Sequence, residues 1–449
     1  MRTVYRHAER WLRIVPAAVL VYIVAYMDRV NIGFAMAGGM NESLHLSAVA
    51  SGTAAGMFFW GYLLLQVPGG HFAEHRSPKR FLQWSIVAWA VISALTAFVR
   101  SGTELLVMRF LLGLAEGGAY PAILVLIGRW FTRAELGRAN GLFMISLPLS
   151  AAISNPVSGW IVSHYSWRGL FLFEGTIAFA LLLVWVPLIC DDPAQAAWFR
   201  GPERQWLLSS LAAEKAAAQH SGRAGDRASY SQLLVRKDLW LMIAIYFFFT
   251  ASIFGFLFWL PTILKGLTET TLTRVGWLSA LPLLASAVGV YVFGALSDRS
   301  GNRRWYCAAA MIAFGVFFGA AFAVHRMALL AYGLLLVAGF FSKAMLSPFW
   351  SMPTVLFAPG VSGGARGVIN GIANIGGFVG PVIVGWLTSA DAAPGRAIAF
   401  MSAMAIAGGI LTMLLPASTA RFASPGAGKN VSTPTATGSD ARLVRSRRL

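Results

Sequence analysis

The sequence has few charged residues and almost no cysteine. Only 12% of its 449 residues are charged, whereas soluble domains carry about 25%, so a chain that is water-exposed throughout is excluded. The two cysteines, Cys190 and Cys307, fall near the ends of apolar segments, and we expect both to be reduced and without a disulfide role. Basic residues outnumber acidic ones, 36 to 18. No polar segment combines a basic face with aromatic residues, which excludes nucleic-acid binding.

Long apolar runs, in contrast, recur from end to end, and 57% of the residues are hydrophobic. Each run is long enough to cross a hydrocarbon core about 30 Å thick as a helix. The sequence therefore predicts an all-α membrane protein in a lipid bilayer. Its twelve predicted spans are 14–38, 50–72, 81–99, 104–128, 139–162, 168–189, 239–264, 275–297, 305–324, 328–357, 366–389 and 396–416.

The positions of the basic residues predict the orientation. If both termini are cytoplasmic, the inside segments hold 27 of the 36 Lys and Arg residues. Three more, Arg29, Arg109 and Lys343, fall inside predicted spans, and the outside loops hold Arg100, Arg168, Lys265, Arg274, Arg326 and Arg396. This asymmetry follows the positive-inside rule. We expect a multi-pass protein of a bacterial inner (plasma) membrane, with both termini in the cytoplasm.

A polar segment divides the spans into two groups of six. The predicted organisation is a cytoplasmic N-terminus at 1–13, a six-helix bundle at 14–190, a cytoplasmic linker at 191–238, a second bundle at 239–416 and a disordered cytoplasmic tail at 417–449. The N-terminal segment is expected to form a short interfacial helix anchored by Trp11. We expect no signal-peptide cleavage, since the first apolar run shows no clear small-residue cleavage site.

The stretch "GGHFAEHRSPKR" at 69–80 permits two interpretations. His71, Glu74 and His75 spell H-x-x-E-H, which some zinc proteases use on a helix. Alternatively, the stretch is a turn between two membrane helices. Residues 294–304, "GALSDRSGNRR", repeat the pattern 224 positions later, again between the second and third span of a six-span group. Equivalent loops in two halves are typical of a transporter built from repeats, which favours the turn over the metal site.

Charged residues inside the spans are the candidate functional residues. Asp28 and Arg29 lie in the middle of the first span, where each charge costs about 2.5–3.5 kcal/mol on insertion scales. In the fourth span Arg109, Gly113 and Glu116 share one helix face. We expect Arg109 to pair with Glu116 in an empty site, so that an anion bound by Arg109 releases the acid to take a proton. The alternative for these residues is a purely structural ion pair.

The repeated loop resembles the loop motif of the major facilitator superfamily. Its second copy matches that motif in full, and the first departs from it at Glu74, His75 and Ser77. In the family this loop locks helices at the cytoplasmic face, which implies a gate role here, although a solvated loop obeying the charge rule is the simpler alternative. The implied gate residues are Gly70, Glu74, Lys79, Arg80, Gly294, Asp298, Arg299 and Arg303, with Gly301 and Arg304 completing the second motif.

Further segments resemble the anion:cation symporter branch of that superfamily. They are "AYMDRVNIGFA", "RFLLGLAEGG", "SWRGLFLFEG", "FWLPTIL", "SPFWSMPT" and "NGIANIGGFVGP". The resemblance implies import of a small organic anion by proton symport, with alternating access between two pseudo-symmetric bundles and no cofactor beyond the proton gradient. Asp28 and Glu116 would carry protons. The implied substrate-binding residues are Arg29, Arg109, Tyr26, Tyr62, Ser347, Trp350 and Asn370.

Lys343 departs from the pattern of that branch. It lies deep in the tenth span and shares a helix face with Ser347 and Trp350. A further cation from the second half suits a second carboxylate, so we expect a dicarboxylate such as phthalate or tartrate. The alternative is a lysine that reaches toward the membrane interface.

Other functions remain open at this stage. A sugar acid or aromatic monocarboxylate is the alternative substrate, and an efflux antiporter or a transporter-like sensor is the alternative activity. The sequence offers no nucleophile–base pair, so we expect no enzyme. The partners expected are a small organic anion and protons, and the protein is expected to be a monomer.

Overall fold

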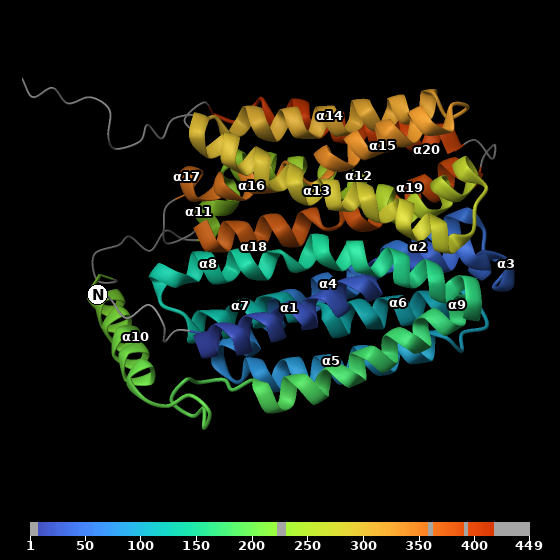
Figure 1. Ribbon diagram of the computed structural model, residues 1–449. Helices are drawn as coiled ribbons and strands as arrows, with labels where there is room; N and C mark the ends of the chain where they lie inside the picture. The colour runs from blue at the N-terminus through green and yellow to red at the C-terminus, as the bar shows by residue number, and fades with distance from the viewer. Residues whose placement is uncertain (1–7, 222–229, 358–361, 390–393, 417–449) are drawn as a thin grey trace, which may run out of the picture.

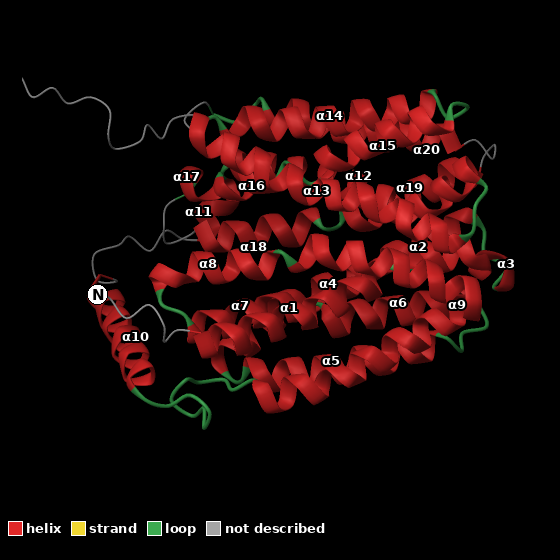
Figure 2. Cartoon of the chain, viewed as in Figure 1, coloured by secondary structure: helices red, strands yellow, loops and turns green. Residues whose placement is uncertain are grey.

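Every element in the described part of the chain is a helix (Figure 2). The computed structural model describes residues 8–221, 230–357, 362–389 and 394–416. The predicted tail at 417–449 and the central part of the linker lie outside these residues. The elements of the first half are α1 (Ala8–Val30), α2 (Ile32–Ala35), the π-helical turn η1 (Met36–Met40), α3 (Asn41–Ser43), α4 (Ala48–His75), α5 (Pro78–Thr96), α6 (Gly102–Glu116), α7 (Ala119–Trp130), α8 (Arg133–Met144) and α9 (Ser146–Leu188).

Two short helices in the linker separate this half from the second. They are α10 (Pro202–Ser221) and α11 (Tyr230–Val235). The second half contains α12 (Lys237–Thr268), α13 (Leu272–Ser300), α14 (Arg303–Ala323), α15 (Ala328–Ser342), α16 (Leu346–Ser351), α17 (Pro353–Leu356), α18 (Ser362–Ala373), α19 (Gly376–Ser389) and α20 (Pro394–Thr412).

Ten helical stretches of the described residues are long and apolar enough to cross a bilayer. One of them, Ala134–Leu188, has 55 residues and is broken at Ser166, whose φ is 78°. Its two arms pack on different neighbours, since Gly159 lies against Leu272 of α13 and Gly175 against Ala90 of α5, so it supplies two crossings. With the 19-residue α5, these elements make the twelve crossings in two groups of six that the sequence predicts.

The two halves lie side by side along their whole length (Figure 1). Helices coloured blue to green form one group and those coloured yellow to red the other. We call the end that carries the start of α1 and the linker helix α10 the near face. The opposite end, which carries α3 and the break at Ser166, is the far face.

Serine residues set the start of several helices. The hydroxyl oxygens of Ser47, Ser77 and Ser101 accept hydrogen bonds from backbone N–H groups in the first turns of α4, α5 and α6. Such N-caps satisfy donors that a helix start leaves without a partner. The boundaries of these crossings are therefore encoded locally.

The first crossing begins earlier than the sequence suggests. Residues from Ala8 onward are continuous with the membrane helix, so the structure has no separate interfacial helix there. Trp11 packs on Phe131, with ring centroids 4.5 Å apart. The cause is Arg10, which is fully buried and bonded to Glu135 at 3.0 Å and Glu203 at 2.9 Å. Because its charge is paired, Arg10 enters the packed helix instead of staying in water.

Glycines bring the two halves into close contact toward the far face. A Cβ added at Gly33, Gly52 or Gly385 would meet a backbone oxygen of the other half within 2.3 to 2.6 Å. Gly159 and Gly276 approach each other's helices in the same way, at 2.4 and 2.6 Å. No larger residue fits this spacing without separating the helices. These contacts hold the halves together toward the far face, beside a cavity of about 200 Å³ whose lining includes Met36, Trp259 and Lys265.

Candidate functional site

The first crossing has a slight irregularity directly after the Asp28–Arg29 pair. Helix α1 ends at Val30 and α2 begins at Ile32, but Asn31 between them keeps a helical backbone and donates to the Met27 carbonyl at 3.0 Å. A side chain of α6 binds the two carbonyls that precede it. Arg109 of α6, which is fully buried, donates from Nη1 to the Asp28 carbonyl at 3.1 Å and from Nη2 to the Arg29 carbonyl at 3.3 Å. Arg109 thus binds α6 to the end of α1.

Arg29 lies inside the bundle with one acidic partner and several aromatic ones. Its guanidinium is 3.5 Å from the carboxylate of Glu116. It also lies over the rings of Tyr62, Phe58 and Tyr26, at 4.6, 4.9 and 5.6 Å from their centroids. A desolvated cation–π contact contributes about 2 kcal/mol or more. Together these contacts stabilise a charge that stands away from water.

The pair formed in this site is Arg29–Glu116, and the expected Arg109–Glu116 pair is wrong for this conformation. Arg109 and Glu116 share a face of α6 but lie about two turns apart. The carbonyls at the end of α1 offer Arg109 two acceptors. Arg29 comes from the facing helix and reaches Glu116 instead. Both predicted acids and both predicted arginines are therefore brought together, with the partners exchanged.

A third buried acid, Glu174 of α9, was not singled out from the sequence. It lies one turn after Phe171, whose carbonyl accepts a hydrogen bond from the Ser93 hydroxyl at 3.4 Å. Asp28 Oδ1 accepts a hydrogen bond from Ser93 Oγ at 2.8 Å. Both acids are at most 1% exposed. The sequence did contain a signal for Glu174. It is an ionisable residue in the middle of the apolar run 168–189, and such residues are rare inside membrane helices.

Lys343 faces the first half from the second. Helix α15 ends at Ser342, and the tenth crossing is interrupted at Lys343, whose φ of −120° and ψ of 0° are not helical. The Lys343 ammonium lies 3.5 Å from the Tyr26 hydroxyl and 5.3 Å from the centre of the Tyr26 ring. It is 7% exposed. The structure therefore places Lys343 toward the interface between the halves.

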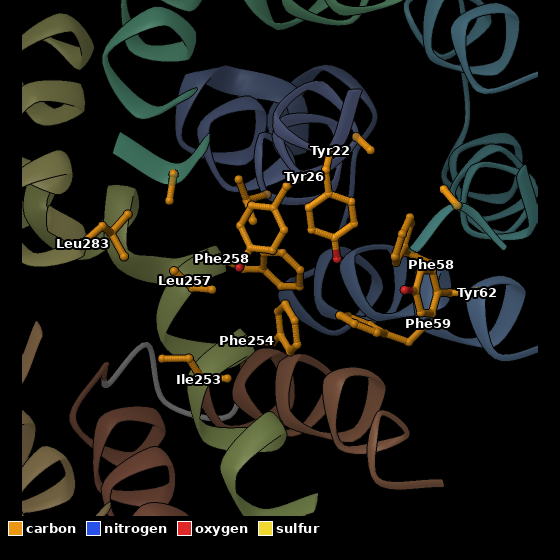
Figure 3. Close-up of a cluster of buried hydrophobic side chains, with 14 of the residues drawn as sticks. Tyr22, Tyr26, Phe58, Phe59, Tyr62, Ile253, Phe254, Leu257, Phe258 and Leu283 are labelled. Atoms are coloured by element: carbon orange, nitrogen blue, oxygen red, sulfur yellow. The ribbon is translucent and has the colours of Figure 1, made fainter. Parts of the chain in front are cut away.

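Aromatic side chains of both halves surround this position. Figure 3 shows Tyr22 and Tyr26 of α1 beside Phe58, Phe59 and Tyr62 of α4 and Phe254, Leu257 and Phe258 of α12. The rings of Phe59 and Phe254 are 4.4 Å apart, so the cluster joins the halves. Tyr26 and Tyr62, both predicted to line the site, belong to it.

Three predicted substrate contacts have partners within the second half. Ser347 packs on α13, where its Oγ is 2.6 Å from the position of a Cβ at Gly294. Trp350 contacts the ring of Tyr246, with centroids 5.0 Å apart. Asn370 accepts two hydrogen bonds from the Asn374 amide, at 2.7 and 3.2 Å. The shared face predicted for Lys343 and Ser347 is lost because the helix breaks between them.

The first gate loop is fastened within its own half. Asp191 accepts hydrogen bonds from the hydroxyl of Ser77 and from the backbone N–H of Lys79. Arg129 donates to the carbonyls of Ala73 and Glu74. Gly70 lies against Pro121, while Arg80 and the Glu74 side chain are exposed. His71 and His75 stack at 4.0 Å on the last turn of α4, so this stretch ends a helix and turns, as the repeat predicts.

The second gate loop has a different backbone shape. Gly301 ends α13 with a φ of 68°, a left-handed conformation that glycine adopts without steric cost. Its counterpart Ser77 has a φ of −128° and caps α5 instead. Asp298 lies 3.9 Å from Arg303, whose guanidinium also donates to the Ser351 carbonyl at 3.3 Å, and Arg299 is exposed. The imperfect first motif therefore reflects a real difference in the turn.

A family model described as Major Facilitator Superfamily matches residues 18–381 and, in a second match, residues 266–447. The chain belongs to the major facilitator superfamily. A protein of Agrobacterium vitis named for tartrate transport is 32% identical over 416 residues, which cover 90% of each chain. A protein of Acinetobacter baumannii named as a quinolone resistance transporter is 28% identical over 421 residues, 91% of this chain and 94% of that one. The chain is thus a transporter and not an enzyme.

The fold is also shared with solved transporter structures. A bacterial homologue of the human lysosomal transporter Spinster, in an inward-facing and unoccupied conformation, superposes with a TM-score of 0.72 at 15% sequence identity. The match covers 92% of this chain and 96% of that one. The predicted fold of twelve membrane helices in two bundles is therefore confirmed.

Proposed function

We propose that this transporter imports a small organic anion together with protons, and that the anion is a dicarboxylate such as tartrate or phthalate. The observation that carries the proposal is a pair of buried cations around one tyrosine. The Arg29 guanidinium lies 5.6 Å and the Lys343 ammonium 5.3 Å from the centre of the Tyr26 ring. They belong to opposite halves, so one dicarboxylate bound between them contacts both halves at once. The name of the tartrate-transporting relative supports this choice.

The Arg29–Glu116 pair supplies a way to couple the anion to protons. A substrate carboxylate competes with Glu116 for the same guanidinium. An acid that loses its cation partner in a water-poor site binds a proton more readily. Arg29 Nε has no hydrogen-bond partner among the described residues, so a donor is available before Glu116 leaves. Anion binding and proton uptake at Glu116 are thereby linked, with Asp28 as the second proton-carrying acid.

The direction of transport follows from an orientation that we also propose. The concentration of basic residues supports a cytoplasmic near face in a bacterial inner membrane. The glycine contacts hold the halves together toward the far face, which supports a conformation that is more tightly packed on that side. The hydrogen bonds of the gate loops lie within their own halves. This supports a gate that does not join the two halves at the near face in this conformation.

Uptake into proteoliposomes tests the proposal. Radiolabelled tartrate, phthalate and a sugar acid are offered with and without an inward pH gradient, and a protonophore is added afterwards. We expect gradient-driven accumulation of a dicarboxylate that collapses with the protonophore. Binding without accumulation would instead indicate a sensor or a facilitated carrier, and preference for a sugar acid would replace the dicarboxylate.

The relative named for quinolone resistance supports one alternative, an efflux antiporter of the same fold. The two activities differ in the direction in which protons move relative to the substrate. An antiporter accumulates its substrate when the proton gradient is directed outward from the vesicle interior, and a symporter when it is directed inward. Both gradients belong in the same experiment.

A further inference from the structure

A cavity of about 200 Å³ lies between the two halves toward the far face. Its first-half wall comes from η1, α3 and α4, and its second-half wall from Trp259, Thr262 and Lys265 of α12. Pockets for drug-sized ligands measure roughly 300–1,000 Å³, so this cavity suits a smaller molecule. Neither Arg29 nor Lys343 lines it, which makes it separate from the buried site.

The Lys265 ammonium is the cation of this cavity. It donates a hydrogen bond to the Ala37 carbonyl at 2.8 Å, from one half to the other. The next two residues, Gly38 and Gly39, have non-helical backbones. An ammonium has three N–H donors and the Lys265 side chain is exposed, so donors remain for a ligand. Glu42 lines the same cavity, but no salt bridge joins it to Lys265 in the described part of the chain.

Asn41 supplies further donors from the first-half wall. Its Oδ1 accepts a hydrogen bond from Ser51 Oγ at 2.8 Å, and an amide held by its oxygen turns its N–H₂ group away from that partner. Both residues line the cavity. A carboxylate accepts hydrogen bonds from an ammonium and from an amide. It is also a stronger partner for an ammonium than a neutral carbonyl is, because both members of the pair are then charged.

The cavity lies on the far-face side of the contacts that hold the halves together. Along α4, Ser51 lines the cavity, the adjacent Gly52 approaches the Pro381 carbonyl, and Tyr62 contacts the buried Arg29. At a helical rise of about 1.5 Å per residue, Ser51 and Tyr62 stand roughly 16 Å apart along the helix. A ligand in the cavity is therefore distinct from one bound at Arg29.

We propose that this cavity is a peripheral binding site for a small carboxylate anion, which replaces the Ala37 carbonyl as the partner of Lys265 and is also bound by the Asn41 amide. A dicarboxylate that enters from the far face meets this site before it reaches the buried cations, a role that rests on the proposed function. Glu42 weakens binding because its charge repels an anion, which suits a site that releases its ligand.

Protection of a cysteine tests binding without any transport. Thr262→Cys places a thiol in the cavity wall, and Arg29→Gln in the same protein disables the buried anion site. We expect saturating tartrate to slow modification of this thiol at least about threefold, and the neutral four-carbon polyol threitol to have no effect. Mass spectrometry of the modified peptide measures the rate. Thr103→Cys, exposed in the first turn of α6 at the far face, is the control and should not respond to tartrate.

Charge variants of the same protein identify the binding group. Lys265→Gln keeps a hydrogen-bond donor and loses the charge, and we expect it to abolish the protection. Glu42→Gln removes the opposing charge, so we expect protection at a lower tartrate concentration. Protection that persists in Lys265→Gln, or no protection before that change, would overturn the proposal. If Arg29→Gln does not fold, Lys343→Met provides the background instead.

Uptake kinetics test the role of the site in entry. With Lys265→Gln as the only substitution, we expect the KM for dicarboxylate uptake to rise at least about fivefold while Vmax stays within about twofold, because the buried site is intact. An unchanged KM would overturn the entry role. Failure of wild-type uptake would contradict the proposed function alone, since the labelling comparison still stands.

Discussion

At the scale of single residues, Arg29 and Glu116 show how charges are held inside the membrane. Arg29 has one carboxylate at 3.5 Å and three aromatic rings around it. An intramembrane ionisable residue usually marks a binding or proton pathway, and the single weak pair here leaves both partners available to a ligand and a proton. Two predictions follow from this geometry.

Glu116→Gln removes the acid that competes for Arg29. We expect substrate exchange between equal solutions to persist, while stimulation of uptake by a pH gradient falls at least tenfold, because the acid no longer binds and releases a proton. Both rates are measured in the same proteoliposomes. Glu104→Gln, at an exposed acid on the same helix, serves as the control. Undiminished gradient stimulation would remove Glu116 from the coupling step.

Lys343→Met tests the second cation. The substitution keeps the length of the side chain and removes its charge beside Tyr26. We expect the affinity for dicarboxylates to fall at least tenfold, about 1.4 kcal/mol or more, with a much smaller effect on monocarboxylates. Competition assays with both substrate classes measure the difference. Equal losses for the two classes would indicate a structural lysine.

At the scale of helices, function is concentrated where regular structure is interrupted. The tenth crossing breaks at Lys343, while the first keeps a helical backbone through Asn31. Broken helices near the middle of the membrane are a recurring feature of transporter binding sites, because the freed backbone groups face a cavity or a partner. In the first crossing the Arg109 side chain binds the carbonyls of Asp28 and Arg29. The glycines that let the halves approach lie on several crossings, among them α4 and α19.

Gly52→Val is predicted to open the far face. An added Cβ at Gly52 would lie 2.3 Å from the backbone oxygen of Pro381, so the closed state is destabilised and the population shifts to the alternative state. The readout is thiol labelling of Ala55→Cys, a fully buried position one turn along α4 from Gly52. We expect faster labelling with Gly52→Val and no change with Gly333→Val, where an added Cβ meets nothing within 4 Å. Unchanged labelling would show that the contact does not control closure.

At the scale of the whole molecule, Arg10 ties three distant segments together at the near face. Its guanidinium donates to the Trp130 carbonyl, to Glu135 of α8 and to Glu203 of the linker helix α10. It also lies over the rings of Phe131 and Trp206. The start of the chain, the first bundle and the linker are thus held by one buried cation.

Arg10→Met is expected to loosen this junction. Removing one partner of a buried ion pair typically costs about 3–5 kcal/mol, so we expect a lower melting temperature and faster proteolysis of the linker. Arg200→Met is the control, because the exposed Arg200 of the linker donates only to the nearby Ala197 carbonyl. That substitution is expected to cost no more than about 1 kcal/mol. Equal effects of both variants would argue against a special role for Arg10.

The sequence alone determined the twelve crossings, the two halves and five charged residues buried within them, Asp28, Arg29, Arg109, Glu116 and Lys343. These features depend on run length, spacing and composition, which are local properties of the chain. Only the tertiary structure decided which charges meet: Arg29 and not Arg109 pairs with Glu116, and Arg10 is buried with Glu135 and Glu203. The partners come from different helices, and the rotation of one helix against another depends on packing that no single helix encodes. The sequence did not predict the break at Lys343, which separates Lys343 from the helix that carries Ser347, for the same reason.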